Sequence, residues 1–258
     1  MTYLLSDYLN AYPIVTISLA VHFLVDFQLQ SPQMAETKKT SHKGLVHHLL
    51  IVGLGYLILS IFFQKYAAYF LAVGLAHVLL DSSKFFFTKN RKADRSIKAN
   101  YNWERNAFLI DQALHLVAII GLYFWLMSTS FFEINSYFYQ IPTFLLFFIL
   151  ITKPINILFK VLFTKYQPDN LKSVKTKASE EEETIVGAGA TIGSLERIAM
   201  GILIILGQFA AIGLVFTAKS IARYNKISES PAFAEYYLIG SLYSIISVLL
   251  ISWICFGI

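Results

Sequence analysis

The sequence predicts an all-α protein, a polytopic transmembrane helical bundle with six to seven spans. Three observations lead to this prediction. Of the 258 residues, 56% are hydrophobic and only 14% are charged, which is unusual for a soluble domain of this size. Several apolar runs reach the ~20 residues that a helix needs to cross a bilayer. Helices are expected because a helix satisfies its backbone hydrogen bonds within one such run.

Seven apolar runs are long enough to enter or cross the membrane. They cover residues 11–30, 44–64, 67–88, 107–127, 141–165, 195–217 and 232–257. Lys153 and Pro154 lie in the middle of the fifth run, and a proline inside a helix breaks or kinks it. We therefore expect this run to be broken, kinked or re-entrant, which leaves six or seven crossings.

Composition divides the chain into four parts. Residues 1–130 form a four-span block, and residues 131–165 form the broken or kinked helical segment. Residues 166–193 combine the charged run KSVKTKASEEEET with the glycine-rich GAGATIG, a composition typical of a flexible linker. Residues 194–258 form a C-terminal two-span block.

Basic residues in the short loops indicate the orientation, because loops rich in Lys and Arg stay in the cytoplasm. Segment 31–43 has three lysines and segment 89–106 has six Lys or Arg residues, whereas segment 128–140 has none. We expect the two basic segments to be cytoplasmic and the N-terminus to lie outside. The first residues lack the basic region and the cleavage site of a signal peptide, so none is expected.

Three of the apolar runs carry a histidine and an aspartate at spacing i,i+4. The pairs are His22 with Asp26, His77 with Asp81, and the reversed pair Asp111 with His115. Side chains at this spacing share a helix face, with Cβ atoms about 6 Å apart. The second run begins with His47 and His48, which point about 100° apart, so we expect only one of them, His48, to join the pairs.

The expected topology brings these polar residues to one depth in the membrane. The first and third runs head inward and carry their pairs near the end, whereas the second and fourth head outward and carry theirs near the start. An up-down arrangement of four helices places such residues together in the bundle core. The sequence therefore predicts one cluster, near the cytoplasmic face.

Such a cluster is typical of a metal site. An aspartate near the bilayer centre costs ~2.5–3.5 kcal/mol, so intramembrane carboxylates usually face an interior site. Carboxylate oxygens and imidazole nitrogens suit zinc, and also manganese or iron. The predicted metal ligands are His22, Asp26, His48, His77, Asp81, Asp111 and His115. They exceed the needs of one tetrahedral ion and suit two, as in many hydrolases.

Catalytic roles follow from the same residues. Asp26, Asp81 and Asp111 are candidates, since an aspartate not bound to metal can act as a base. Lys84, on the same helix face as Asp81, can hold a phosphate or carboxylate, or it snorkels to the interface. Gln28, Gln30 and Gln112 can add hydrogen bonds. The structural alternative is that the Asp–His pairs only clamp helices together.

The C-terminal block has a polar set of its own. It consists of Glu196, Arg197, Lys219, Arg223 and Glu235. Acidic and basic residues at a helix boundary favour salt bridges or contacts with anionic lipids, and a site for a substrate headgroup is the alternative. The net charge of +5 is attributed to cytoplasmic loops, so we expect membrane lipids as partners and no nucleic acid.

Four motifs, HFLVDFQLQ, KGLVHHLL, AHVLLDSSK and FLIDQALHL, resemble the bacterial membrane family known as domain of unknown function 3307. The resemblance covers roughly residues 15–120. The segments IGSLER, AKSIAR and AEYYLIGSL are similar to the C-terminal extension of its longer members. This resemblance implies a multi-pass protein of the bacterial cytoplasmic (inner) membrane and assigns no reaction.

The His-x₃-Asp usage is also similar to that of membrane-bound metal-dependent hydrolases. More distantly it is similar to that of the zinc-dependent phospholipase C and single-strand nuclease group, whose further motifs do not occur in this sequence. This similarity implies metal-binding roles for His22, Asp26, His77 and Asp81, with Asp111 and His115 as a reversed pair.

Three functions remain open from the sequence. The first is a membrane metal-dependent hydrolase acting on a phosphoester or lipid-linked substrate. The second is a metal-ion or proton transporter that uses the same residues as a relay. The third is a membrane sensor or scaffold in which the Asp–His pairs are structural clamps.

Overall fold

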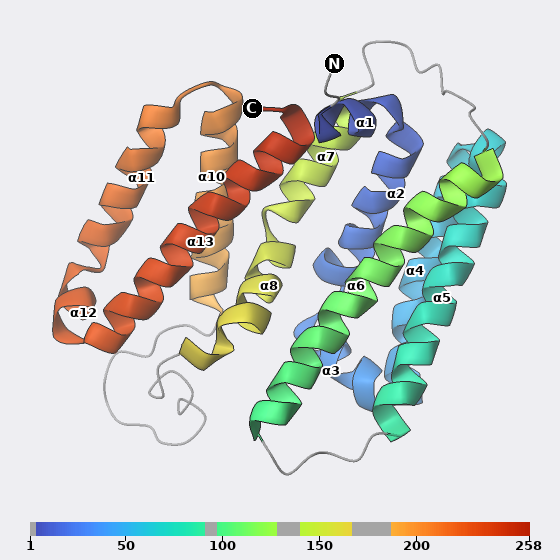
Figure 1. The fold of residues 1–258 in the computed structure, drawn as a ribbon, viewed down its shortest axis with the longest axis horizontal. Helices are drawn as coiled ribbons and strands as arrows, with labels where there is room; N and C mark the ends of the chain where they lie inside the picture. Colours follow the sequence, from blue (N-terminus) through green and yellow to red (C-terminus); the bar gives the residue numbers. More distant parts are fainter. Residues whose placement is uncertain (1–3, 91–96, 128–139, 167–186) are drawn as a thin grey trace. The chain divides into compact units, whose positions relative to one another are not determined.

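The computed structural model describes residues 4–90, 97–127, 140–166 and 187–258, and within these ranges it is helical and contains no strand (Figure 1). In the described ranges, six helices are long and apolar enough to cross a membrane. A seventh span results if the bent pair Leu5–Ala11 and Pro13–Gln28, at 99°, is counted as one. The predicted all-α fold with six to seven spans is thus confirmed.

The helices form two compact units. One unit is Asp7–Leu146, and the other is Phe147–Ile258 together with the N-terminal residues up to Ser6. The first unit contains most of α1 (Leu5–Ala11), then α2 (Pro13–Phe23), η1 (Leu24–Gln28), α3 (Pro32–Thr40), α4 (His42–Phe62), η2 (Gln64–Tyr66), α5 (Ala67–Asn90) and α6 (Ile97–Met127).

In the first unit, α4 and α5 lie side by side, and α6 packs against α5 and α2. Two buried tyrosines join these helices through main-chain carbonyls. Tyr56 on α4 donates a hydrogen bond to the carbonyl of Ser18 on α2 at 3.3 Å, and Tyr69 on α5 donates to that of Ile119 on α6 at 3.1 Å. Each bond satisfies a polar group that would be costly to leave unpaired in an apolar core.

Helix α3 lies within a segment that we had expected to be a loop. Its start has a physical cause: the Ser31 hydroxyl accepts a hydrogen bond from the Met34 amide at 3.1 Å, and Pro32 occupies the first helical position, both of which favour a helix start. It packs against α4 and α5. It lies at the end of the unit where α5 ends and α6 begins (Figure 1).

The second unit contains α8 (Lys153–Phe163), η4 (Thr164–Tyr166), α10 (Ala188–Ile205), α11 (Phe209–Ala222), α12 (Tyr224–Glu229) and α13 (Pro231–Phe256). α7 (Ile141–Leu150) crosses the division between the units. A turn at residues 151–152 separates α7 from α8, just before Pro154. Most of the predicted linker 166–193 lies outside the described residues, and its residues 188–193 begin α10.

The expectation of one continuous run over 195–217 was wrong. Helix α10 ends at Ile205, and α11 begins at Phe209. Between them Gly207 has a φ of +70°, a backbone conformation that glycine adopts without steric cost. The run is apolar on both sides of this turn, so hydropathy alone did not reveal it. At 14 residues, α11 is shorter than the ~20 residues of a full crossing.

Candidate metal centre

All seven predicted ligands lie in the first unit and are buried. The most exposed of them, Asp111, is 8% exposed, and His22 and His48 are completely buried. Removing a carboxylate from water is costly unless a cation or hydrogen bonds compensate it. The contacts of these side chains therefore indicate what the cluster can hold.

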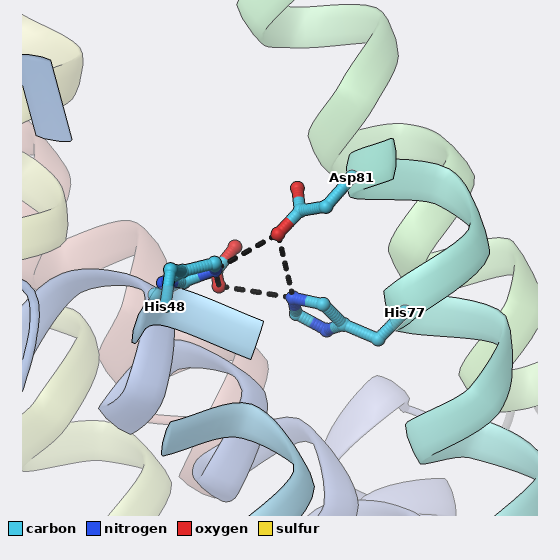
Figure 2. A group of neighbouring side chains, drawn as sticks. His48, His77 and Asp81 are labelled. Carbon is cyan, nitrogen blue, oxygen red and sulfur yellow. Dashed lines mark ion pairs between the residues drawn. The ribbon is translucent and has the colours of Figure 1, made fainter. Parts of the chain in front are cut away.

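The first group of ligands consists of Asp26, His48, His77 and Asp81, which can offer four donor atoms within 4.8 Å of one another. His48 Nε2 lies 2.8 Å from Asp81 Oδ2 and 3.3 Å from Asp26 Oδ1. His77 Nε2 lies 3.1 Å from Asp26 Oδ1 and 3.5 Å from Asp81 Oδ2. Figure 2 shows His48 from one helix facing His77 and Asp81 from another.

The contacts between these imidazoles and carboxylates are close ion pairs. Asp26 Oδ1, Asp81 Oδ2 and His77 Nε2 are buried and have no hydrogen-bond partner among the described residues. Buried polar atoms are normally satisfied, and each exception calls for an explanation such as a bound ion. Two carboxylates and two imidazoles arranged in this way could hold a divalent cation.

Asp26 belongs to a π-helical turn. The Leu29 amide donates to the Leu24 carbonyl at 2.9 Å, five residues back, so the helix widens around Asp26. Such turns occur often at functional sites. We expected His22 and Asp26 to point to one place. Both side chains reach the cluster: Asp26 contacts His48 and His77, and His22 contacts the His77 ring and Gln112.

The second group consists of Asp81, Asp111 and His115, whose donor atoms also lie within 4.8 Å of one another. His115 Nδ1 lies 2.8 Å from the Asp111 main-chain carbonyl oxygen. A carbonyl can only accept, so Nδ1 carries the proton and Nε2 carries the lone pair. That Nε2 is buried and has no hydrogen-bond partner within the described ranges. Asp81 belongs to both groups and thus joins them.

Gln112 orients three members of the cluster. Its amide nitrogen donates to Asp26 Oδ2 at 3.5 Å and to Asp111 Oδ2 at 3.4 Å. Its amide oxygen lies 3.3 Å from His22 Nε2. His22 also stacks on the ring of His115, with centroids 5.2 Å apart. The structure therefore places His22 beside the two ligand groups, where it supports them through Gln112 and His115.

Two lysines complete the centre. Lys84 Nζ lies 2.6 Å from Asp111 Oδ2, so this side chain faces the cluster. Lys38 on α3 was missed in the sequence, and its Nζ lies 3.4 Å from His48 Nε2 and 4.0 Å from Asp81 Oδ2. The sequence signal for it is Ser31 followed by Pro32, which is typical of a helix start. This start predicts a helix that carries Lys38 where a loop was expected.

Other polar residues considered from the sequence are less buried than the two ligand groups. His47 is exposed, whereas its neighbour His48 is buried. His42 is exposed, and its Nε2 lies 2.9 Å from Lys89 Nζ. Gln28 and Gln30 are half-buried. Of the three glutamines considered from the sequence, Gln112 is therefore the one that the structure joins to both Asp26 and Asp111.

The C-terminal polar set divides into two parts. Glu196 pairs with Lys219, with 2.7 Å between Oε2 and Nζ. Arg197 turns inward and is only 3% exposed. It donates to the Ile151 and Thr152 carbonyls at 2.5 and 3.3 Å, which lie at the break between α7 and α8. Arg223 is half-buried and Glu235 is exposed.

Arg197 also donates to Asn156 Oδ1 at 2.6 Å and to Ser244 Oγ at 3.3 Å. The guanidinium thus donates to two carbonyls at this break, and the Thr152 carbonyl also accepts from the Asn156 amide at 3.4 Å. Arg197 therefore stabilises the broken helix, a role that differs from the boundary salt bridge or lipid contact expected from the sequence.

Comparisons with known proteins give one finding. Neither a search of curated proteins nor a search of solved structures returned a match. Residues 14–145 match the family described as "Protein of unknown function (DUF3307)". The matched segment contains both ligand groups, Gln112 and both lysines. Because the match spans half of the sequence, the protein belongs to the DUF3307 family.

Proposed function

We propose that this protein is an integral membrane metal-dependent hydrolase whose centre binds one or two divalent cations. The observation that carries the proposal is the sharing of Asp81 by two buried groups of donor atoms. Two ions that share a carboxylate lie close enough to act on the attacking and the leaving oxygen of one bond.

The donor set favours zinc, with manganese and iron as alternatives. Its members are imidazole nitrogens and carboxylate oxygens, which these ions accept. The hydrogen bond from His115 Nδ1 to a main-chain carbonyl is the kind of support that metal-binding histidines usually have. Gln112 gives comparable support to Asp26 and Asp111.

The proposed reaction is hydrolysis of an ester. A divalent cation at this centre would supply an activated water and polarise the ester. Asp26 and Asp111 are the candidate bases, since each is held by Gln112 through one carboxylate oxygen. The water oxygen bonds to the phosphorus or carbonyl carbon of the ester, and the carboxylate takes the water proton. The bond from that atom to the leaving alcohol oxygen breaks, and the carboxylate returns the proton to this oxygen.

We place the reaction at the cytoplasmic face of the bacterial inner membrane. Helix α3 contributes Lys38 and Lys39, and Lys43 lies in the first turn of α4, so the end of the unit closest to the centre is basic. Basic segments favour the cytoplasmic side. A centre in that leaflet can receive a lipid-linked or phosphoester substrate.

The test is an activity assay on protein purified in detergent, stripped with chelator and reloaded with zinc, manganese or iron. The chromogenic substrates are p-nitrophenyl phosphate, bis-p-nitrophenyl phosphate and p-nitrophenyl acetate. We expect metal-dependent hydrolysis of at least one, reduced on the order of 100-fold in Asp81→Asn. Ser83→Ala, an exposed position on the same helix, is the matched control.

Two results would contradict the hydrolase. One is a metal-loaded wild type that hydrolyses none of the three substrates. The other is hydrolysis that Asp81→Asn leaves intact. A metal-loaded protein without hydrolysis that carries the metal into proteoliposomes would be a transporter instead.

A further inference from the structure

Lys38 and Lys84 connect the buried centre to the protein surface. Their side chains are 16% and 30% exposed, whereas the Asp81 and Asp111 side chains that they face are 3% and 8% exposed. Each lysine thus has its charge at the centre and part of its length at the surface. The two lysines are therefore the partly exposed cations beside the buried carboxylates.

The two lysines belong to different ligand groups. Lys38 lies beside His48 and Asp81 of the first group, and Lys84 pairs with Asp111 of the second. Asp81 is common to both groups, so it links the group beside Lys38 to the group beside Lys84. An anion bridging the two ammonium groups would therefore lie over the shared carboxylate.

The net charge of the centre depends on its carboxylates, its metal ions and these two ammonium groups. The centre contains three carboxylates, those of Asp26, Asp81 and Asp111, which two divalent cations would more than neutralise. The two ammonium groups would then lack full anionic compensation. Excess positive charge in a low-dielectric site is unfavourable, so a centre loaded with two divalent ions would favour an anion that carries more than one negative charge.

We propose that Lys38 and Lys84 bind the terminal phosphate of a phosphomonoester, which is the substrate or product of this centre. The inference rests on the proposed hydrolase and narrows its substrate class. A phosphomonoester carries about −1.5 to −2 charge at pH 7 and offers three strong acceptor oxygens. Ammonium groups form strong, charge-assisted hydrogen bonds with such oxygens. A phosphodiester has a single negative charge and no terminal phosphate.

The experiment is calorimetric titration of inorganic phosphate into the full protein in neutral detergent at saturating zinc, with metal content measured on every sample. Lys38→Met and Lys84→Met are compared with Lys39→Met and Lys89→Met, whose side chains are exposed neighbours in the same helices. We expect phosphate affinity to fall at least about tenfold in the first two variants and to stay unchanged in the controls. Lys38→Arg, which keeps the charge, should retain most of the affinity.

The outcomes separate this inference from the function on which it rests. Full metal content with wild-type phosphate affinity in both Lys38→Met and Lys84→Met would overturn the role of the lysines and leave the metal centre standing. A wild type that binds no metal would overturn the hydrolase and with it the inference. Unchanged affinity in Lys38→Arg supports a charge contact.

Competition identifies the source of the phosphate. Glycerol 3-phosphate and micellar phosphatidic acid both carry a terminal phosphate, and at least one should displace inorganic phosphate. Displacement by phosphatidic acid alone indicates a lipid, and equal displacement by both indicates the phosphate group as such. Displacement by phosphatidylglycerol, a diester, as effective as that by phosphatidic acid would overturn the monoester assignment.

Discussion

His115 donates a hydrogen bond from Nδ1 to the main-chain carbonyl of Asp111 at 2.8 Å, one helical turn away. This bond fixes the tautomer, because the carbonyl can only accept. Nε2 then carries the lone pair and is buried, and His115 shares a ligand group with Asp81 and Asp111. A purely structural Asp–His clamp would use the ring to donate to the carboxylate, whereas this arrangement leaves the ring able to bind a cation.

Replacement of His115 by alanine should therefore weaken metal binding without unfolding the protein. We expect the affinity to fall by about 10–100-fold, measured by competition with a chromogenic chelator. His115→Gln keeps most of the volume and should behave in the same way. Wild-type affinity in both variants would show that His115 is not a ligand.

The adjacent histidines on α4 provide a matched pair. His48 is buried at 3.3 Å from Asp26 and 2.8 Å from Asp81, whereas His47 is exposed. We expect His48→Ala to lose bound metal and His47→Ala to retain it, as measured by mass spectrometry on purified protein. Equal metal contents in the two variants would argue against the first ligand group.

Gly44 allows α3 to approach α4 and thereby positions Lys38. A Cβ atom at Gly44 would lie 2.5 Å from the Thr37 carbonyl carbon, whereas one at Gly53 on the same helix would meet nothing within 4 Å. Gly44→Ala should cost about 1–3 kcal/mol of stability, as overpacking does, and should lower phosphate affinity by displacing Lys38. Gly53→Ala is the control for a glycine-to-alanine change within a helix.

The readouts for this pair are the midpoint of thermal unfolding and the phosphate titration at saturating zinc. A Gly44→Ala protein with the midpoint and the phosphate affinity of Gly53→Ala would refute the role assigned to α3.

Arg197 should matter for the stability of the second unit and not for metal binding. Arg197→Leu removes the guanidinium donor from the Ile151 carbonyl, at about 1–3 kcal/mol for a buried group left unsatisfied, whereas the Thr152 carbonyl keeps the Asn156 amide as a donor. We expect a lower thermal midpoint with unchanged metal content, because both ligand groups lie in the other unit. Arg197→Lys should not rescue it, since an ammonium cannot reproduce the planar fork of donors. Loss of metal at an unchanged midpoint would contradict this assignment.

Much of the centre follows from spacing alone. Histidine and aspartate at i,i+4 inside apolar helices predicted that these side chains gather. The structure brings six of the seven predicted ligands into two groups, which are Asp26, His48, His77, Asp81, Asp111 and His115. Burial is costly for such residues, so their presence in apolar runs was informative. Their metal-binding role and the orientation of the centre remain predictions.

Three features could not be read from hydropathy. The π-helical turn around Asp26 depends on how the helix packs. The turn at Gly207 interrupts an apolar run whose composition does not change. Helix α3 has low hydrophobicity, so its basic residues resembled a loop, and Lys38 was overlooked although Ser31 and Pro32 marked the helix start.

The most direct test of the central claim is metal content, measured by mass spectrometry on the full protein in detergent. Wild type is compared with Asp26→Ala and Asp81→Ala. The shared-ligand centre predicts one to two equivalents of zinc, manganese or iron in wild type and a loss in both variants, with the larger loss in Asp81→Ala because Asp81 belongs to both groups. A folded wild type that contains no metal even after loading would contradict the metal centre.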